Sequence, residues 1–330
     1  MQPPFTRTGS VWKWAADFLS LGDSVQTTIK SGIHLVGTGL HSGRPVRMSV
    51  LPASAEYGIW FRRVDVAGRD NLIAARYDNV ADTQLCTCIV NEAGVSVSTV
   101  EHLMAALAGC GIHNALIEID GPEVPVMDGS SLRFVREILA AGVQRLNAPV
   151  RLIRVLEPVA LDEGGVRVSL TPSDNLEIRF SIEFPDAAIG RQSMHLNMAN
   201  GAFVRELCAS RTFCRKADVD WMRARGLGLG GTLENAVVVD GPEVLSPGGL
   251  RHADEFVRHK MLDALGDLAL AGAPLLGRYE GLRAGHAATN RLLRKLFATP
   301  MAYEMITCDA ATARKLPGVG VSAADMRAVA

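Results

Sequence analysis

The sequence predicts an α+β fold in which each half of the chain forms strands followed by helices. With 330 residues the chain is long enough for about two ordinary domains, each with its own core. Strand-like segments come in short series rather than in strict alternation with helices, which is typical of α+β layers. Each half also contains a helix, a glycine and a strand that ends in an acidic residue and glycine (Asp120-Gly121 and Glu280-Gly281). We therefore expect an internal duplication.

The first half contains strand patterns and two helix patterns with clear stops. Apolar residues recur at helical spacing over residues 100–108, where glycines end the pattern, and again over 132–141. β-branched and aromatic residues predict strands over 46–50, 59–62 and 115–119. We expect these elements to form a first domain over residues 26–148.

A new strand series begins after the turn residues near 147–149, and we place a domain boundary there. Strands are predicted over 151–155, 166–170, 178–182 and 275–279, and helices over 255–270 and 286–297. The second domain is expected over residues 149–310, with a tail over 311–330.

Composition argues against nucleic-acid binding and against a membrane-embedded protein. Lys and Arg number 34 against 35 Asp and Glu, so no overall field attracts a polyanion. No apolar run approaches the roughly 18 residues that a membrane span needs. The six cysteines are scattered, and the close pair Cys86 and Cys88 has a spacing that suits a strand. We expect a reduced, cytoplasmic protein and take a monomer as the default.

Residues 1–25 form an extension before the predicted domains. Val11, Trp14, Phe18 and Leu21 recur at helical spacing, which is typical of a small amphipathic helix that contacts a membrane surface or another subunit. An appended segment without a fixed structure fits the same residues. Membrane contact is therefore expected to be peripheral at most.

A polar stripe on an otherwise apolar helix carries the first chemical signal. His259, Asp263 and Asp267 follow one another at intervals of four and so share one helix face. A histidine and a carboxylate at this spacing can converge on one divalent cation, as in helical zinc motifs. An exposed charged stripe stabilised by pairs four residues apart is the alternative. The spacing alone leaves both open.

The segment before the helix at 100–108 carries a second signal. Ser98 and Glu101 have the spacing of a capping box, which predicts a structural role. That role leaves His102 unexplained. A histidine ligand beside a glutamate that can accept a proton from water is an arrangement used by hydrolytic zinc sites. A solvated histidine is the alternative.

The third signal is His286, which follows Gly285 at the predicted start of a helix. Its imidazole lies near free backbone amides there and could be tuned by a carboxylate such as Asp267. A surface histidine at a helix start fits the same residues.

Taken together, these segments resemble the UDP-3-O-acyl-N-acetylglucosamine deacetylase family in the order of their motifs and in the residues of each motif. The matching motifs are residues 37–43 (GTGLHSG), 98–103 (STVEHL), 125–130 (PVMDGS), 210–213 (SRTF), 259–263 (HKMLD) and 285–286 (GH). The resemblance runs from about residue 31 to residue 297. It leaves out the N-terminal extension and the end of the tail.

The resemblance implies two α+β domains, each a β-sheet layered with two helices, with the active site at the domain interface. It implies that zinc is bound by His102 from the first domain and by His259 and Asp263 from the second. This donor set also accepts Fe²⁺. Three protein ligands leave one position open, as in catalytic rather than structural zinc sites.

For the reaction, the resemblance implies hydrolysis of the acetamide of UDP-3-O-(3-hydroxyacyl)-N-acetylglucosamine, the committed step of lipid A biosynthesis. Glu101 would accept a proton from the attacking water, and Thr212 and His286 would stabilise the oxyanion. His286 would then protonate the leaving amine, held in place by Asp267. Lys260 is a candidate for contact with the diphosphate or the developing charge, and a solvated lysine is its alternative.

The acyl chain needs an apolar slot, which this family builds from an insert that maps to residues 211–240. Leu233, Ala236 and Val238 supply apolar surface there, and nearby glycines allow close backbone approach. Phe213 resembles the family's aromatic residue beside the nucleotide sugar. We expect Cys86 on a strand near the mouth of the site, without a catalytic role.

Two other classes of protein compete with this interpretation. A sugar-nucleotide-binding relative that has lost its metal would not need Glu101, His102, His259, Asp263 and His286 together. A zinc peptidase would place its ligands on one helix as His-Glu-x-x-His, which is absent. The two ligand histidines are instead 259 − 102 = 157 positions apart, so two distant segments must meet in space.

Overall fold

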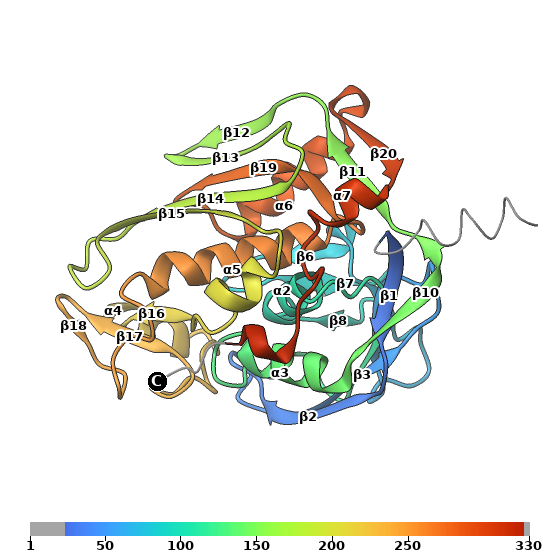
Figure 1. Ribbon diagram of the computed structural model, residues 1–330. Helices are drawn as coiled ribbons and strands as arrows, with labels where there is room; N and C mark the ends of the chain where they lie inside the picture. The colour runs from blue at the N-terminus through green and yellow to red at the C-terminus, as the bar shows by residue number, and fades with distance from the viewer. Residues whose placement is uncertain (1–23, 327–330) are drawn as a thin grey trace, which may run out of the picture.

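The computed structural model describes residues 24–326 and has the predicted α+β fold, with two sheets on the outside and helices between them (Figure 1). The helix predicted around Trp14 lies outside the described residues. Within residues 24–326, no helix is both long enough and apolar enough to cross a bilayer.

The first outer layer is a five-stranded mixed sheet that is followed inwards by two helices. Its strands, in spatial order, are β2 (Ile33–Thr38), β3 (Pro45–Pro52), β9 (Ala115–Ile119), β4 (Ile59–Arg63) and β5 (Leu72–Ala74). Helix α2 (Glu101–Gly109) precedes the central strand β9, and α3 (Leu132–Ala141) follows it. The sequence ALIEI of β9 is alternately buried and half-buried, because successive side chains of a strand point to opposite faces.

The second outer layer is a seven-stranded sheet built around β19. Five of its strands, in spatial order, are β12 (Val159–Glu163), β13 (Val166–Thr171), β19 (Leu275–Leu282), β14 (Leu176–Glu183) and β15 (Arg191–Asn197). The sixth, β11 (Arg151–Val155), pairs with the first residues of β19, and the seventh, β20 (Tyr303–Thr307), pairs with β11. Helix α5 (Glu255–Ala269) precedes β19, and α6 (His286–Phe297) follows it.

The two outer sheets repeat one topology. The central strand β9 is antiparallel to β3 and parallel to β4, and β19 is likewise antiparallel to β13 and parallel to β14. The flanking pairs β2–β3, β4–β5, β12–β13 and β14–β15 are all antiparallel. In each half a helix leads into the central strand and another helix follows it. This topology agrees with the predicted internal duplication.

Three smaller sheets complete the described chain. Strands β6 (Val80–Asp82), β7 (Cys88–Val90) and β8 (Ser96–Val97) come before α2. In the corresponding place before α5 lie β16 (Phe213–Arg215), α4 (Lys216–Arg223), β17 (Val237–Asp240) and β18 (Glu243–Val244). Strand β1 (Val25–Ile29) pairs with β10 (Val143–Pro149). The short helix α7 (Ala310–Ala313) spans the predicted start of the tail.

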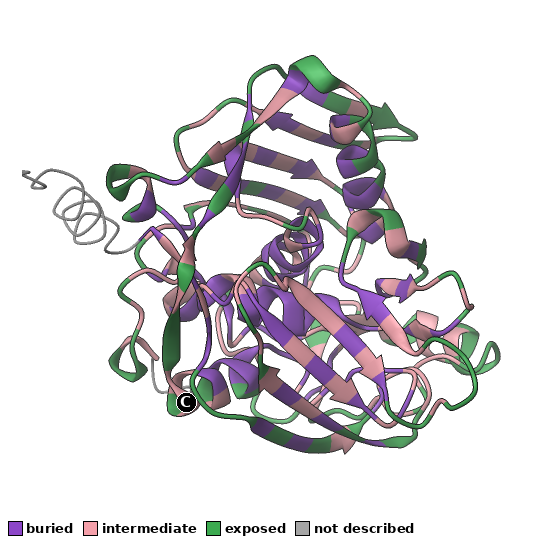
Figure 2. Cartoon of the chain, turned by 90° about the vertical axis from the view of Figure 1, so that its right-hand side faces the viewer, coloured by how far each residue is buried: buried purple, intermediate pink, exposed green. Residues whose placement is uncertain are grey.

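The central helices α2 and α5 are buried on nearly all sides. Every residue of α2 except Ala108 is buried, and α5 contacts α2 on one side and β14 on another. Figure 2 shows buried bands along the strands and buried helices between the sheets. A helix that is covered all round has no solvent-facing stripe. Polar residues on these two helices are therefore held inside the protein, where they need partners.

Gly266 of α5 lets the two helices approach most closely. A Cβ atom at this position would overlap the backbone carbonyl of Glu101 at the start of α2. The contact brings the first residues of α2 against the middle of α5, which is where the conspicuous polar residues of both helices lie.

Candidate active site

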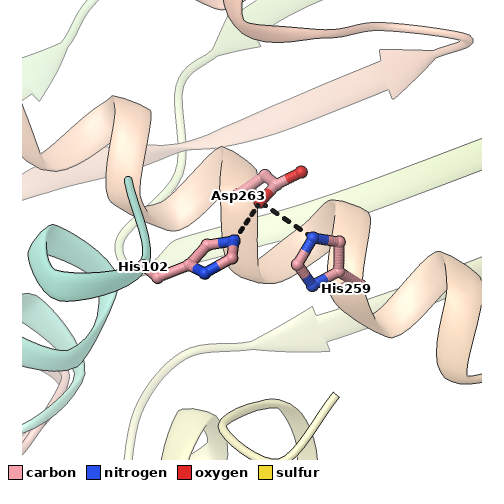
Figure 3. Close-up of side chains that lie close together, drawn as sticks. All are labelled: His102, His259 and Asp263. Carbon is pink, nitrogen blue, oxygen red and sulfur yellow. Dashed lines mark ion pairs between the residues drawn. The ribbon is translucent and has the colours of Figure 1, made fainter. Parts of the chain in front are cut away.

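His102, His259 and Asp263 converge where α2 meets α5, and each is buried, with 3–5% of its surface exposed (Figure 3). Asp263 Oδ1 lies 3.5 Å from His102 Nε2 and 3.3 Å from His259 Nε2. Ligand atoms about 2.0–2.1 Å from a tetrahedral zinc ion lie about 3.3–3.4 Å from one another. Because these residues are buried, His259 and Asp263 do not belong to an exposed charged stripe, and His102 is not a solvated histidine.

The two oxygens of Asp263 have different surroundings. Oδ2 accepts a hydrogen bond of 2.6 Å from Lys260 Nζ. Oδ1 is buried and has no hydrogen-bond partner among residues 24–326. Burial opposes ionisation, but His259 and Lys260 hold the pKa of Asp263 well below its usual range. A buried anionic oxygen between two imidazoles is costly without a cation, so this donor set fits a divalent metal.

The imidazole of His259 is oriented by its second nitrogen. Nδ1 lies 3.1 Å from the carbonyl oxygen of Ser210, to which it can donate. This leaves Nε2 with a lone pair that faces Asp263, the usual arrangement behind a metal-ligating histidine. Burial lowers the pKa of His259 to about 4, so the ring is neutral at physiological pH, as a metal ligand must be.

Glu101 is buried beside the triad and is held by a loop. Its Oε2 accepts a hydrogen bond of 3.0 Å from the backbone N–H of Thr87, and its Oε1 lies 3.9 Å from His286 Nε2. Burial raises the pKa of Glu101, and the neighbouring histidines His286 and His102 oppose the shift. The carboxylate thus faces His286 from the residue that directly precedes His102 in α2.

The predicted capping box at the start of α2 is wrong. No side chain caps this helix, and Ser98 Oγ donates to the carbonyl of Pro122 instead. Thr99, between Ser98 and the helix, has a left-handed backbone conformation with a φ of 57°. Glu101 begins the helix, and its buried carboxylate faces His286.

His286 lies at the first position of α6, as predicted, and is 9% exposed. Its Nδ1 is 2.8 Å from Asp267 Oδ2. Burial alone would lower the pKa of His286, but the carboxylates of Asp267 and Glu101 outweigh it and raise the pKa to about 9. Asp267 accepts a second hydrogen bond, of 2.6 Å, from Thr87 Oγ1 to its Oδ1.

The segment that contains Thr212 and Phe213 borders the metal-ligand group. The Phe213 ring meets the His259 ring edge-on at 6.1 Å between centroids and packs against Phe256 at 5.0 Å. The backbone N–H of Thr212 donates to the carbonyl of Gly129 at 2.7 Å. This bond joins two of the sequence motifs, which come from different halves of the chain.

The apolar residues proposed for the acyl slot have unequal exposure. Leu233 is 40% exposed, Val238 is half-buried on β17, and Ala236 is buried. A cavity of about 650 Å³ lies elsewhere, between the sheets, with Met104 and Leu265 of the central helices in its wall. None of the site residues described above lines it.

Two residues near the site belong to no motif that predicts their role, and one residue lies elsewhere than the sequence predicts. Thr87 contacts both Glu101 and Asp267 from a loop before β7. Glu123 is buried and accepts from the N–H groups of His41 and Ser42, which fixes the glycine-rich turn. Cys86 lies before β7, outside any strand, so its predicted place on a strand is wrong. Its side chain is buried.

Comparisons with known proteins place the chain in a family. The family model described as UDP-3-O-acyl N-acetylglycosamine deacetylase matches residues 26–298. UDP-3-O-acyl-N-acetylglucosamine deacetylases from Phenylobacterium zucineum and Idiomarina loihiensis are 49% and 45% identical to this chain. The alignments cover 86% of this chain in both cases, and 96% and 93% of those proteins. That of Pasteurella multocida is 42% identical over 86% of this chain and 93% of its own length.

The family model covers most of the chain, and the buried histidine and aspartate group lies within the matched residues. This chain belongs to the family of UDP-3-O-acyl-N-acetylglucosamine deacetylases.

Proposed function

We infer that this chain is a metal-dependent hydrolase that removes the acetyl group of UDP-3-O-acyl-N-acetylglucosamine, a step of lipid A biosynthesis. Membership of the family supports the substrate and the reaction. The observation that carries the chemistry is one buried cluster in which three metal-binding side chains adjoin Glu101 and the His286–Asp267 pair.

We propose zinc as the metal, held by His102, His259 and Asp263, with Fe²⁺ as the other cation that this donor set accepts. A zinc ion bound there supplies Lewis-acid polarisation of the amide carbonyl and of the attacking water. Lys260 neutralises the outer oxygen of Asp263, which leaves the inner oxygen directed at the two imidazoles.

Glu101 is proposed as the general base. Its Oε1 faces the site while its Oε2 is engaged by the loop. As water attacks the acetamide carbon, Glu101 accepts the proton that the water gives up. The new C–O bond makes a tetrahedral centre, whose oxyanion needs nearby positive charge or donors.

His286 is proposed as the general acid. Its Nδ1 is committed to Asp267, so Nε2 faces the reacting centre. When the C–N bond breaks, His286 gives its proton to the nitrogen, which leaves as the 2-amine while the acyl carbon leaves as acetate. Before that step the imidazolium and the Thr212 hydroxyl are proposed to stabilise the oxyanion. Asp267 keeps the ring protonated and oriented.

The substrate contacts are proposals that the family resemblance supports. Phe213 is proposed to lie beside the nucleotide sugar, and Leu233, Ala236 and Val238 to contribute to the acyl slot within residues 211–240. Because Lys260 already pairs with Asp263, we propose that it acts on the developing charge rather than on the diphosphate.

We also propose a division of the chain into domains at residues 26–148 and 149–310, with the reaction centre at their interface. The 3-hydroxyacyl form of the substrate, a monomeric state, a cytoplasmic location and the lack of a nucleic-acid partner remain proposals from the sequence.

The test is an acetate-release assay combined with metal analysis on the purified protein. We expect release of acetate and of a free amine from UDP-3-O-(3-hydroxyacyl)-N-acetylglucosamine, with about one divalent ion per chain. Binding of the sugar nucleotide without acetate release would identify a binding protein instead. Peptide hydrolysis without acetate release would identify a peptidase.

A further inference from the structure

Four residues, which include the proposed acid and base, form a closed ring of contacts. Thr87 donates its backbone N–H to Glu101 Oε2 at 3.0 Å and its hydroxyl to Asp267 Oδ1 at 2.6 Å. The other oxygens of these two carboxylates lie 3.9 Å from His286 Nε2 and 2.8 Å from His286 Nδ1. Thr87 therefore touches both carboxylates that flank the imidazole of His286.

Thr87 is fixed in the loop by further contacts. It is 1% exposed, and its carbonyl oxygen accepts a hydrogen bond of 3.3 Å from the N–H of Val100, the residue before α2. Its backbone is thus tied to the start of α2 in one half, while its hydroxyl reaches α5 in the other half. Threonine is β-branched, so rotation about its χ1 bond is already restricted. The side chain of Thr87 therefore loses little conformational entropy when its hydroxyl makes this hydrogen bond.

The hydroxyl completes the coordination of Asp267. With one oxygen on Thr87 and the other on His286 Nδ1, the carboxylate plane of Asp267 cannot turn without losing a bond. Without the hydroxyl, Oδ1 would be a buried acceptor with one partner fewer, and the carboxylate would be free to rotate away from the imidazole.

The geometry points to Thr87 as a positioning residue of the deacetylation. It fixes the orientation of Asp267, and through Asp267 the orientation of the His286 imidazole relative to Glu101. This inference rests on the proposed function. Thr87 does not contact the metal-ligand atoms, so it acts on the alignment of the proton donor rather than on metal binding. We expect loss of the hydroxyl to lower activity about 10- to 100-fold, by analogy with the loss of groups that orient metal ligands.

The test compares Thr87→Val, which keeps the shape and removes the hydroxyl, with Thr87→Ser, which keeps the hydroxyl. We expect Thr87→Val to lower kcat about 10- to 100-fold with KM and zinc content close to those of the wild type. We expect Thr87→Ser to restore most of kcat. A wild-type kcat in Thr87→Val, an equal loss in Thr87→Ser, or a loss in proportion to zinc would each overturn the inference.

Thr28→Val is the matched control for stability. Thr28 is also a buried threonine, and its hydroxyl bonds the carbonyl of Asn114 at 2.7 Å, away from the site. We expect Thr28→Val to lower the unfolding midpoint and to leave kcat unchanged. A kcat loss of equal size in Thr28→Val would mean that the effect of Thr87→Val is general destabilisation.

A second measurement separates this inference from the proposed function. In the zinc-loaded protein labelled with ¹⁵N-histidine, the Nδ1–H proton of His286 should be protected from exchange in the wild type and in Thr87→Ser. It should exchange rapidly in Thr87→Val. If no variant, nor the wild type, releases acetate, the proposed function fails, but this signal still tests whether Thr87 holds the imidazole. Equal protection in all three proteins would overturn the positioning role.

Discussion

At the scale of single residues, three neighbouring carboxylates in the candidate site have different partners. Asp263 has one oxygen on Lys260 and the other facing the imidazoles of His102 and His259. Asp267 is committed to hydrogen bonds on both oxygens, whereas Glu101 has one oxygen free to face the reacting centre. The same chemical group can therefore serve as metal ligand, orienting partner or base.

Replacement of Glu101 separates its chemical role from its structural one. Glu101→Gln keeps an oxygen that can accept from the Thr87 N–H but removes the basicity, so we expect turnover to fall about 10²-fold or more with metal content intact. Glu101→Ala should lose at least as much. Steady-state kinetics with metal analysis checks this result. Near-normal turnover in Glu101→Gln would mean that another group takes the proton.

The pH dependence of the reaction should report the His286–Asp267 pair. The proposed acid must be protonated, and the carboxylates of Asp267 and Glu101 raise the pKa of His286 to about 9 despite burial. The rate should therefore fall as pH rises through that pKa. In Asp267→Asn one raising charge is gone, so the pKa should drop and the alkaline limb should move to lower pH, with a lower maximum rate.

The measurement is kcat/KM against pH for the wild type, Asp267→Asn and His286→Ala. The observed limb belongs to the coupled site rather than to one group. If the alkaline limb is the same in all three proteins, His286 is not the acid, and Lys260 or the attacking water becomes the better assignment.

At the scale of elements, the site depends on how closely α2 and α5 pack. Gly266 is placed where a Cβ atom would overlap the backbone carbonyl of Glu101, and backbone cannot yield as a flexible side chain can. We expect Gly266→Ala to destabilise the protein by about 3 kcal/mol or more, although alanine favours a helix by about 1 kcal/mol.

Gly285→Ala serves as the control for this substitution, because a Cβ atom there meets nothing within 4 Å and φ is −143°. Denaturant unfolding of both variants checks the expectation. A Gly266→Ala protein as stable as Gly285→Ala would show that the helices can separate without cost, and the close packing would not be a requirement of the fold.

The sequence predicts elements better than it predicts contacts. The ranges 115–119, 132–141 and 286–297 coincide with β9, α3 and α6, because apolar periodicity and glycine stops are local signals. The pairing of β1 with β10 joins residues more than a hundred positions apart and has no such signal. The predicted capping box is wrong because Ser98 Oγ bonds the carbonyl of Pro122 and Thr99 has a left-handed backbone, which a spacing pattern cannot reveal.

In the site, too, local motifs were predicted from the sequence and contacts between distant segments were not. His102, His259 and Asp263 were found because their types and spacing match a family motif, and they do come together. Thr87 was missed because its importance depends on where a loop lies after folding. An isolated threonine in that loop has no residue type or spacing that distinguishes it from a threonine in any strand.

At the scale of the whole molecule, the candidate metal site formed by His102, His259 and Asp263 joins the two repeated halves. His102 comes from α2 of the first half, whereas His259 and Asp263 come from α5 of the second. The hydrophobic core runs without interruption across the same contact. A cation bound there would link both halves in the folded state and would find no such group in the unfolded chain.

Metal binding should therefore raise the stability of the whole chain. A ligand present at about a thousand times its Kd adds about 4 kcal/mol, which for a chain of this length corresponds to a rise of about 6 °C in Tm. We expect chelation to lower Tm by this order and zinc to restore it. His259→Ala should abolish the metal-dependent difference, whereas His34→Ala, at an exposed histidine outside the site, should keep it. Thermal unfolding with and without chelator measures all three proteins. If the difference persists in His259→Ala, the stabilising ion binds elsewhere, and the link between the halves through α2 and α5 must be abandoned.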